Sequence, residues 1–539
     1  MEIKNKIKEF LPYIGVTLAI ILPWLFYPGY LFFTDFVLGP NINLDCSNSF
    51  FIINLIIISF SFIFSIDFLE KLFIGLIIFI ILLASRKIIS HFIKDKFAIF
   101  VVSLFALFNP FIYDRMMYGQ MGIALAFGFF LFAIGYLLKY LDNREGRQMI
   151  YFGICAGFSL QFSVHFVFFI GIVSLFYLVL YFKRWKLNRW RSFVKYVFFA
   201  GVLCMLLNIN WIASGLLSKN NTINFLDSGI TKQDLSAFKT AGSSDSQVLS
   251  NVLMMSGFWG KDQYRYTDLT KIKENWGRSF LFILPVILLG LFFGVKKKET
   301  RFLSIGLLII FIASVILACG INFSHLQNFT YWLFEHIPLY KGLRETQKWV
   351  SVLVLIYTVF LSIGVTALLK TKIVLVHKNF LLIFLGAVII MQAPFLLWGF
   401  WGQVKPVSYP TDWQAVDKEL KCEKGGKILF LPWHLYMSFN WVGKIIANPA
   451  KGFFTCPVIS SSAMEWGGIY DNSQNNDSEK VFEWLNKKGE NDLLKNNELG
   501  IKYILLAKEL DWGNYLWLEK TVRVKLIDET LTLKVYEIQ

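Results

Sequence analysis

Long apolar runs dominate this sequence and constrain its fold more than any other feature. A helix needs about 20 mostly apolar residues to cross a lipid bilayer, and eleven runs approach that length. These runs are residues 10–27, 70–85, 97–113, 121–138, 149–164, 166–182, 196–217, 280–295, 302–318, 349–369 and 380–400. Only 17% of the residues are charged, whereas soluble domains average about 25%. The sequence therefore predicts a polytopic α-helical membrane protein with about eleven membrane-spanning helices.

A twelfth apolar run, residues 50–66, is compatible with another span or with a helix that lies on the outer membrane surface. Basic residues decide between the two, because Lys and Arg concentrate in cytoplasmic loops. If the run does not cross and the N-terminus is cytoplasmic, the inner loops contain 23 of the 53 basic residues but only six of the 37 acidic residues, a net charge of +17. These inner loops are residues 2–9, 86–96, 139–147, 183–195, 296–301 and 370–378.

The remainder of the chain has 30 basic and 31 acidic residues, and so carries a net charge of only −1. If residues 50–66 crossed the membrane, every later basic cluster would instead lie outside. We therefore expect a surface helix there, a cytoplasmic N-terminus and an extracytoplasmic C-terminal region. The formal charge of +16 reflects this topology, and nucleic-acid binding is not expected.

This topology divides the chain into a transmembrane domain, residues 1–400, and an extracytoplasmic domain, residues 401–539. The outer loops of the first domain are residues 28–69, 114–120, 218–279 and 320–348. The second domain is predicted to be a small α/β unit, with strands at residues 427–431, 501–507, 521–527 and 531–538 and a helix at 479–486. The stretch 432–476 is aromatic and is predicted to be irregular, as long functional loops often are.

The six cysteines include no CxxC or CxxxC pair, which argues against a zinc site or a thioredoxin-like motif. Cys422 and Cys456 fall in the same outward region, where they form a disulfide if that region is oxidised and remain free thiols otherwise. The sequence also lacks the HExxH, GxxxxGKS/T, GxGxxG and GxSxG motifs. Zinc proteolysis, Walker-type ATP hydrolysis and common nucleotide-binding loops are therefore not expected.

Asp35 is the first candidate for chemistry in the outer loops. It follows the first apolar run and has Phe33 and Phe36 as close neighbours in the sequence. A carboxyl group among aromatic rings near a bilayer is expected to have a raised pKa, which suits a general base. The alternative is an ordinary solvated loop aspartate.

A second candidate region is the segment 109–120, where Asn109-Pro110 interrupts a helix near its outer end. The turn that follows contains four candidate substrate-binding residues: Tyr113, Asp114, Arg115 and Gln120. A guanidinium such as that of Arg115 suits bidentate contact with a phosphate or a carboxylate. The alternative is an interfacial Asp114–Arg115 ion pair with a tyrosine anchor.

A third candidate region precedes the tenth apolar run and contains Arg344, Glu345 and Lys348 at helical spacing. Such a basic pair at headgroup level suits binding of a lipid phosphate, although charged side chains at helix ends also snorkel without a ligand. Two further residues lie at outer tips: His165 between two spans, and Trp259, whose indole suits stacking on a sugar. The alternatives are a structural histidine and an ordinary interfacial aromatic residue.

The order of these motifs resembles the GT-C superfamily of membrane glycosyltransferases, in particular prokaryotic members related to the YfhO family and to the arabinofuranosyltransferases of cell-wall synthesis. The shared features are a Pro-Gly and an acid after the first helix, a surface helix, an Asn-Pro-Phe…Gly-Gln segment, an Arg-Glu…Lys segment and a terminal β-rich domain. In this chain they are Pro28-Gly29, Asp35, residues 50–66, residues 109–120, Arg344, Glu345, Lys348, and segments 500–505 and 535–538. The resemblance spans nearly the whole chain.

The resemblance implies a glycosyltransferase of the cytoplasmic membrane that acts at its outer face with a polyprenyl-phosphate-linked sugar. In this interpretation Asp35 is the general base that deprotonates a hydroxyl of an envelope glycan, lipid or protein, and Arg115, Arg344 or Lys348 stabilises the departing phosphate. Many superfamily members carry a second acid close to the first, but here the nearest is Asp45. We therefore predict no metal and no other cofactor.

Two other functions are compatible with a chain of this kind. A flippase or transporter of a lipid-linked saccharide would keep transporting without Asp35, but its spans would be expected to contain more ionisable residues than these do. A non-catalytic envelope assembly protein would lose its function with residues 401–539 and would tolerate Asp35→Asn.

Overall fold

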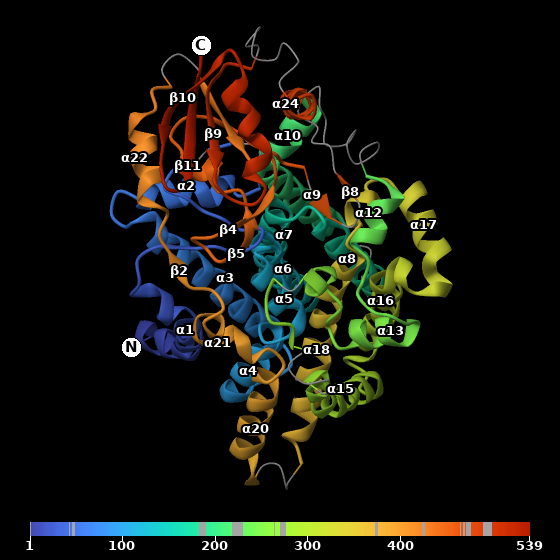
Figure 1. The fold of residues 1–539 in the computed structure, drawn as a ribbon. Coiled ribbons are helices and arrows are strands. Elements are labelled where there is room, and N and C mark those ends of the chain that lie inside the picture. Colours follow the sequence, from blue (N-terminus) through green and yellow to red (C-terminus); the bar gives the residue numbers. More distant parts are fainter. Residues whose placement is uncertain are drawn as a thin grey trace.

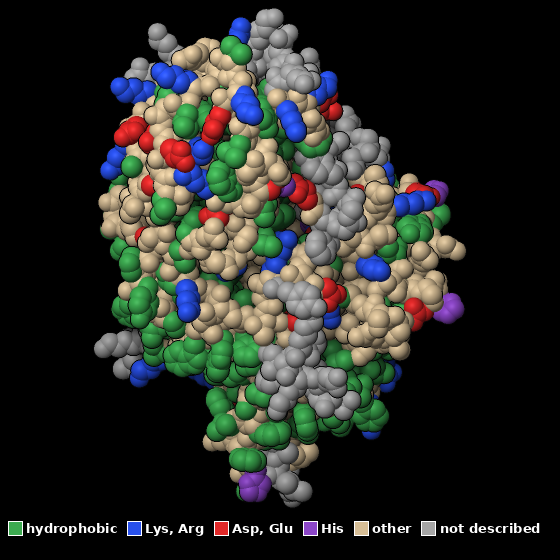
Figure 2. Space-filling model, in the orientation of Figure 1, with side chains coloured by type: hydrophobic (Ala, Val, Ile, Leu, Met, Phe, Trp, Pro, Cys, Tyr) green, Lys and Arg blue, Asp and Glu red, His purple; other side chains and the backbone are tan. Residues whose placement is uncertain are grey.

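The computed structural model of the protein describes residues 2–42, 44–45, 49–182, 190–217, 230–263, 265–269, 276–371, 376–422, 426–463, 465–466, 469–470, 476–488 and 499–539. Most of these residues are helical, and a small mixed sheet forms near the C-terminus. Figure 1 shows the sheet at one end of the molecule and the helices below it. On the face seen in Figure 2, charged side chains gather around the sheet, and hydrophobic side chains cover much of the helical part.

Five helices of the described chain are long and apolar enough to cross a membrane. They are α1 (Glu2–Leu25), α3 (Ile66–Ile89), α6 (Met121–Asn143), α16 (Arg301–Cys319) and α18 (Val350–Leu368), which follows the turn η8 (Thr346–Trp349). Two bent helix pairs raise this number to seven if each pair is one span. The pairs are α4 (Lys96–Ser103) with α5 (Pro110–Tyr118), bent by 53°, and α20 (Lys378–Ile390) with α21 (Leu397–Trp401), bent by 76°.

Five to seven spans are fewer than the eleven predicted from the sequence. The other apolar runs also form helices, namely α7 (Gly146–Phe162), α8 (Phe166–Phe182), α9 (Trp190–Leu207), α10 (Ile209–Leu217) and α15 (Leu284–Lys296). Helices α7 and α8 have 17 residues each, and α15 has 13. At 1.5 Å per residue, 17 residues extend about 26 Å, at the lower limit for a membrane span, and 13 residues extend about 20 Å. Apolar composition located these helices, but it does not by itself make them spans.

The ambiguous run 50–66 forms helix α2 (Phe51–Phe60), which has 10 residues. Its length of about 15 Å is half the thickness of the hydrocarbon core, so it is too short to cross. Ile53 and Ile57 are buried against the protein, whereas Leu55 and Ile56 on the opposite face are exposed. A helix that packs with one face agrees with the surface position expected from the sequence.

The C-terminal sheet has five strands in the order β10-β11-β9-β3-β6. The strands are β3 (Lys427–Leu431), β6 (Val458–Ile459), β9 (Ile501–Ala507), β10 (Val524–Glu529) and β11 (Leu533–Ile538). Strand β3 is parallel to β6 and β9, and β11 is antiparallel to β9 and β10. The sheet is therefore mixed, and its four longer strands lie close to the four predicted segments.

One helix covers each face of this sheet. Trp413 of α22 (Thr411–Glu419) packs in one apolar cluster with alternate residues of β3 and β9, and Trp484 of α24 (Asn476–Asn486) packs in a second cluster with the intervening residues. Successive side chains of a strand point to opposite faces, so strands buried on both sides are continuously apolar. The disulfide between Cys422 and Cys456 joins the segment after α22 to the segment before β6, which resolves the two possibilities left open by the sequence.

The stretch 432–476 was predicted to be irregular, but parts of it form short strands and a short helix. Strands β4 (Tyr436–Phe439) and β5 (Lys444–Ala447) form an antiparallel hairpin, followed by the short helix α23 (Ala450–Phe453) and the two-residue strands β7 (Glu465–Trp466) and β8 (Ile469–Tyr470). These strands have four residues or fewer, which is too short for a clear alternating pattern. The hairpin turn uses Gly443 at φ +73°, a backbone conformation that favours glycine.

The first outer loop is held between the helices and the C-terminal region. Strand β1 (Tyr30–Leu31) pairs with β2 (Pro406–Val407), and the backbone amide of Ala447 donates to the carbonyl of Thr34 at 2.8 Å. From the helical side, Glu70 of α3 accepts a hydrogen bond from the backbone amide of Leu31 at 2.8 Å. Residues distant in the sequence therefore fix the loop that contains Asp35.

Candidate active site

Asp35 is the meeting point of three segments that are far apart in the chain. Its backbone amide donates to the carbonyl of Tyr118 at the end of α5, at 2.9 Å. Its carboxylate accepts a hydrogen bond from the Tyr436 hydroxyl of strand β4 at 2.7 Å and a longer one from the Gln120 amide at 3.4 Å. Both carboxylate oxygens are therefore oriented by neutral donors.

Gly119 allows the loop and helix α5 to approach this closely. It ends α5 in the left-handed conformation, at φ +94°, which costs glycine less than other residues. A Cβ atom at this position would lie 2.7 Å from the backbone nitrogen of Phe36 and 3.0 Å from that of Asp35. A glycine is therefore required sterically at position 119 of the Gly-Gln pair. The segment 114–120, predicted to be an outer turn, is helical as far as Tyr118.

The environment of Asp35 makes its carboxyl group a stronger base than usual. Asp35 is exposed where it lines a cavity of about 880 Å³, although the surrounding protein partly buries its carboxyl group. This burial raises the pKa of Asp35 to about 6, although the hydrogen bonds from Tyr436 and Gln120 act in the opposite direction. A carboxylate with a pKa close to neutral pH is ionised there and still accepts a proton readily.

Gln120 connects Asp35 to a buried ionic cluster centred on Arg115. The Arg115 side chain is fully buried and donates to the Gln120 side-chain oxygen, to Glu345 at 2.5 Å and to Gln347 at 2.5 Å. Its guanidinium also lies over the ring of Phe258, 4.5 Å from the ring centre. Arg115 therefore has protein partners on several sides and no exposed surface with which to meet a ligand.

Glu345 is the anion at the centre of this cluster. It accepts hydrogen bonds from Lys348 and from the indole of Trp259, each at 2.9 Å, in addition to the bond from Arg115. Burial alone would raise the pKa of Glu345, but the positive charges of Lys348 and Arg115 hold it well below the usual range. The carboxylate is therefore ionised, and its charge helps to raise the pKa of Asp35.

His165 lies at the far end of the same cluster. Its Nε2 atom is 2.8 Å from the carbonyl oxygen of Gly342 and 3.3 Å from the Lys348 ammonium, and its Nδ1 atom is 3.1 Å from the Ser163 hydroxyl. Burial and the charge of Lys348 lower the pKa of His165 to about 3, so the imidazole is neutral. The structure thus joins seven of the ten predicted site residues in one network: Asp35, Gln120, Arg115, Glu345, Trp259, Lys348 and His165.

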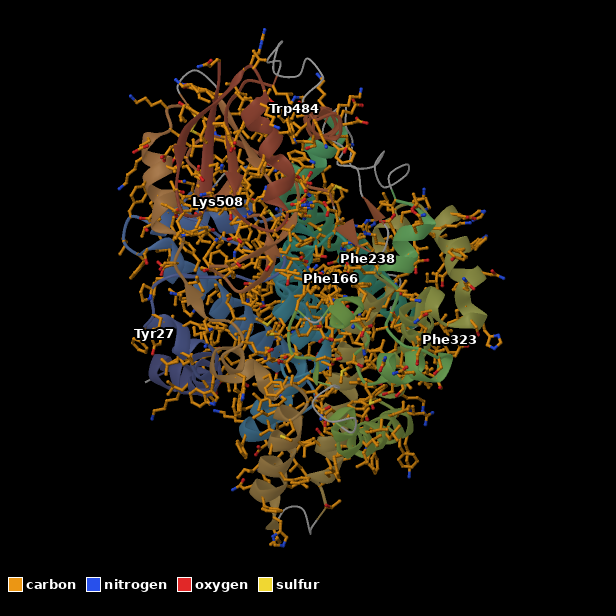
Figure 3. The ribbon with its side chains drawn as sticks, in the orientation of Figure 1. Tyr27, Phe166, Phe238, Phe323, Trp484 and Lys508 are labelled. Carbon is orange, nitrogen blue, oxygen red and sulfur yellow. A yellow bond between two sulfur atoms is a disulfide. The ribbon has the colours of Figure 1, made fainter. Side chains whose placement is uncertain are left out.

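The other three predicted residues contact the long outer loop rather than Asp35. The Tyr113 hydroxyl donates to the carbonyl of Thr267 at 2.7 Å, and Asp114 accepts a hydrogen bond from Tyr266 at 3.0 Å. Arg344 bonds Asp234 of α12 (Lys232–Ala237) at 2.6 Å and lies over the ring of Phe238, which Figure 3 labels. Parts of the predicted outer loop 218–279, namely residues 218–229, 264 and 270–275, lie outside the described residues.

Two residues at the site were missed by the sequence analysis. Tyr436 is 401 positions from Asp35, and nothing in its local sequence distinguishes it from other tyrosines. Arg265 lies over the Tyr436 ring at 4.9 Å from the ring centre and donates to the Tyr118 hydroxyl at 3.2 Å. Its positive charge acts on Asp35, and its side chain is half-buried, unlike that of Arg115.

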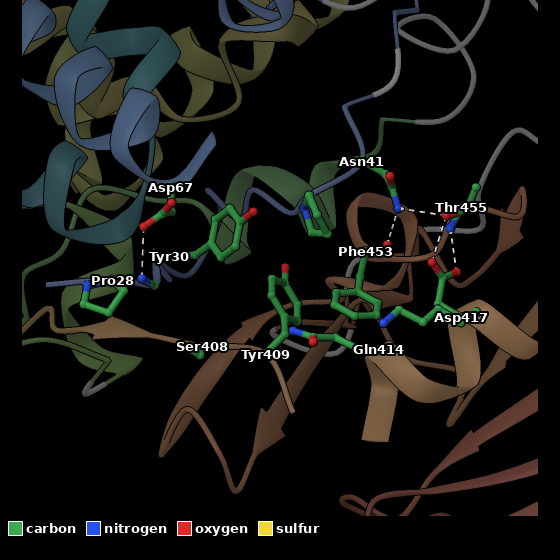
Figure 4. Close-up of a pocket in the computed structure, with 13 residues that line it drawn as sticks. Pro28, Tyr30, Asn41, Asp67, Ser408, Tyr409, Gln414, Asp417, Phe453 and Thr455 are labelled. Atoms are coloured by element: carbon green, nitrogen blue, oxygen red, sulfur yellow. Dashed lines mark hydrogen bonds between the residues drawn. The ribbon is translucent and has the colours of Figure 1, made fainter. Parts of the chain in front are cut away.

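A second cavity, of about 400 Å³, lies between residues 28–41 and helix α22 (Figure 4). Its carboxylates already have partners, because Asp417 accepts two hydrogen bonds from Thr455 at 2.8 Å and Asp67 accepts one from the Gly29 amide at 3.0 Å. These bonds stabilise the contact between the first loop and the C-terminal region. Among the described residues, no three His, Cys, Asp or Glu side chains are grouped to hold a metal ion.

Known structures share this architecture. No protein-family model matches the sequence, and no curated protein matches it by sequence. The cryo-EM structure of the arabinofuranosyltransferase AftD from Mycobacteria matches 98% of this chain with a TM-score of 0.64 and 10% identity, and the chain covers 39% of the AftD structure.

An AftD variant, R1389S, matches 97% of the chain with a TM-score of 0.52. The match to the crystal structure of ArnT from Cupriavidus metallidurans includes 99% of this chain and 98% of the ArnT chain, with a TM-score of 0.43 and 10% identity. The match to AftD covers the helical part and the C-terminal sheet together, and it confirms at the level of the fold the resemblance first suggested by the order of motifs. The chain shares the fold of the arabinofuranosyltransferase AftD over nearly its whole length, and it spans less than half the length of that protein.

Proposed function

We propose that the protein is a membrane glycosyltransferase that transfers a sugar from a polyprenyl-phosphate donor to an acceptor of the cell envelope. One observation carries this proposal: within a fold shared with an arabinofuranosyltransferase, Asp35 combines a pKa of about 6 with two orienting hydrogen bonds and access to a large cavity. These are the properties required of a general base. The donor class follows from the resemblance to the superfamily.

In the proposed reaction, the Asp35 carboxylate removes the proton of an acceptor hydroxyl as that oxygen attacks the anomeric carbon of the donor sugar. The bond between the anomeric carbon and the phosphate oxygen breaks, and polyprenyl phosphate leaves with the electron pair. No nucleotide sugar is required. Tyr436 and Gln120 act as positioning residues, because each bonds one oxygen of the carboxylate.

Arg265 is the cation that we assign to the departing phosphate. Of the basic residues predicted for this role, Arg115 is buried among protein partners, Arg344 is bound to Asp234, and Lys348 is bound to Glu345. Arg265 is half-buried and lies over Tyr436, the residue that bonds Asp35. A guanidinium next to the base is placed to stabilise negative charge as it develops on the leaving group.

The reaction is proposed to take place at the extracytoplasmic face. The charge distribution of the loops supports this orientation, because a cytoplasmic N-terminus gives the inner loops a net charge of +17. The disulfide between Cys422 and Cys456 also supports it, because disulfides persist in oxidising compartments. Asp35, Tyr436 and the disulfide-linked C-terminal region would then share the outer side.

The proposal is tested with the full chain, purified in detergent and supplied with a panel of radiolabelled polyprenyl-phosphate sugars and crude envelope acceptors. Transfer by the wild type that is lost in Asp35→Asn supports it. Asp528→Asn is the matched control, because Asp528 lies in the edge strand β10 of the C-terminal sheet and does not line this cavity. Failure of the folded wild type to transfer any sugar would contradict the proposal.

A further inference from the structure

The cavity that reaches Asp35 has two chemically different walls. One wall is apolar and consists of Ile53 and Ile57 of α2, with Phe73 of α3. Another part of the lining consists of residues 451–452 and 454–458 of the C-terminal region and includes Lys451, and the first loop contributes Asp35 and Asp45. Its volume of about 880 Å³ is within the usual range for sites that enclose a ligand. A ligand that fills it therefore meets a hydrophobic surface, one positive charge at Lys451, and the two carboxyl groups of Asp35 and Asp45.

The walls of this cavity are fixed to each other through the first loop. The backbone amide of Asn41 donates to the carbonyl of Gly452 at 2.9 Å, and the Asn41 side chain donates to the carbonyl of Phe453. Gly39 passes so close to Gly452 that a Cβ atom on it would overlap the Gly452 carbonyl, at 2.2 Å. The cavity is thus a built feature of the contact between loop and C-terminal region.

The outer side of α2 carries a strongly apolar surface. Leu55, Ile56 and Phe60 of α2 are exposed, and in the turn after the helix Phe62 is 89% exposed and Ile63 is 72% exposed. Several large apolar side chains exposed in so short a segment are costly in water and indicate contact with a membrane or a partner. The helix is short and lies next to long apolar helices, so lipid is the simplest cover. The cavity is then separated from the lipid by a single helix.

The positions of the cations distinguish the two substrates of the proposed reaction. Arg265, which we assign to the donor phosphate, does not line this cavity, whereas Asp35 does. The side of Asp35 that faces the cavity is therefore open to the molecule whose hydroxyl is deprotonated. Lys451 supplies a separate positive charge there, and it is exposed.

We propose that this cavity binds the acceptor, and that the acceptor is an anionic membrane amphiphile, a lipid-linked headgroup with a phosphate and a free hydroxyl. Its hydroxyl lies at Asp35, its phosphate at Lys451, and the start of its lipid chain along Ile53 and Ile57. This inference rests on the proposed function and makes it more specific, because it excludes a protein or a soluble polysaccharide as the direct acceptor.

Binding is tested first, since it does not depend on transfer. Native mass spectrometry of the full chain in detergent is used with three probes: lysophosphatidylglycerol, neutral lysophosphatidylcholine and glycerol 3-phosphate. We expect lysophosphatidylglycerol to bind most tightly, and Lys451→Gln and Ile57→Gln each to weaken its binding about tenfold, a loss of roughly 1.4 kcal/mol. Ile56→Gln, on the outer face of the same helix, is the control and should bind as the wild type does.

Lys451 is exposed, so its variant tests the idea even if Ile57→Gln fails to fold. Equal binding of lysophosphatidylglycerol by the wild type and Lys451→Gln would overturn the inference. Tight binding of glycerol 3-phosphate alone would also overturn it, because the site would then recognise a free phosphate and not a lipid.

The second test follows the label in the transfer reaction. After incubation with a radiolabelled donor and crude envelopes, we expect the sugar in the fraction that organic solvent extracts, and Lys451→Gln should reduce this transfer about tenfold. Label found only in the delipidated glycan and protein fraction would overturn the inference but leave the transferase proposal intact. If the wild type and Asp35→Asn transfer equal amounts of label, no transfer depends on Asp35, and both the transferase proposal and the acceptor proposal are overturned.

Discussion

The hydroxyl of Tyr436 donates a hydrogen bond of 2.7 Å to the carboxylate of Asp35, although 401 positions separate the two residues. Tyr436 belongs to the β4–β5 hairpin of the C-terminal region, and Asp35 belongs to the first outer loop. The C-terminal region therefore contributes a residue to the candidate active site. A variant in the hairpin should change the chemistry of a residue at the other end of the chain.

Tyr436→Phe is expected to raise the pKa of Asp35, because the lost hydrogen bond favours the ionised carboxylate. A hydrogen bond to a charged group is worth about 1.5–3 kcal/mol, or about one to two pH units. The acidic limb of the pH–rate profile should move upward by that amount, since a higher pH is needed to ionise the base. Steady-state transfer assays across pH measure this shift.

Tyr503→Phe is the control for that experiment, because Tyr503 belongs to strand β9 and the hydroxyl that bonds Asp35 is that of Tyr436. Its acidic limb should coincide with that of the wild type. If the apparent pKa of the acidic limb is the same in Tyr436→Phe as in the wild type, the hydrogen bond has no influence on the reacting base.

Arg265→Gln is expected to lower kcat by about 10²-fold to 10³-fold, the range found when one charge-stabilising donor is removed from an active site. Arg265→Lys should retain part of the rate, because it keeps the charge but loses the flat contact with Tyr436. Initial rates with saturating donor report this directly. Lys239→Gln, an exposed position in the same outer loop, should leave kcat unchanged, and a similar loss in both variants would refute the assignment.

Glu345→Gln should destabilise the protein strongly. The change leaves Arg115, which is fully buried, and Lys348, which is 7% exposed, without their shared anion. Removing one partner from a buried ion pair typically costs about 3–5 kcal/mol, which thermal unfolding in detergent would detect as a large decrease in Tm.

Glu335→Gln provides the matched comparison for Glu345→Gln. Glu335 pairs with Lys232 at 2.6 Å, but both side chains are largely exposed, and exposed pairs contribute less than about 1 kcal/mol. Its Tm should stay close to that of the wild type. Equal decreases in the two variants would show that burial of the Arg115 cluster does not matter.

The disulfide between Cys422 and Cys456 closes a loop of 34 positions. Chain-entropy arguments give about 4 kcal/mol of stabilisation for a loop of this size. Cys422→Ser with Cys456→Ser should therefore lower the Tm of the C-terminal region, and alkylation followed by mass spectrometry should find no free thiol at these positions in the wild type. Alkylation of both cysteines in unreduced wild type would contradict the pairing.

The parts of the fold that could be predicted are those with strong local patterns. Strands β3 and β9 lie at residues 427–431 and 501–507, as expected, because their apolar runs are bounded by glycine. The helix break at Asn109-Pro110 was also visible: Asn109 caps α5 by accepting a hydrogen bond from the Ile112 amide, and proline occupies the first turn. Such features depend on neighbouring residues alone.

The features that could not be predicted depend on tertiary contacts. The spacing of Tyr436 and Arg265 in the sequence contains no sign that both lie near Asp35, since the β4–β5 hairpin and the long outer loop bring them there. The role of Arg115 also changes for this reason, because only the fold shows that Glu345 and Gln347 surround it. The apolar run 196–217 was predicted as one span but is divided between α9 and α10, because hydropathy does not show where α9 ends and α10 begins.

The most direct test of the account is the pH dependence of sugar transfer by the wild type, measured beside Asp35→Asn with a radiolabelled polyprenyl-phosphate sugar. The wild-type rate should rise with pH along a limb with an apparent pKa near 6, and Asp35→Asn should be slower by about 10²-fold to 10⁴-fold, as expected for the loss of a general base. Transfer by Asp35→Asn at the wild-type rate, with the same acidic limb, would show that another group is the base.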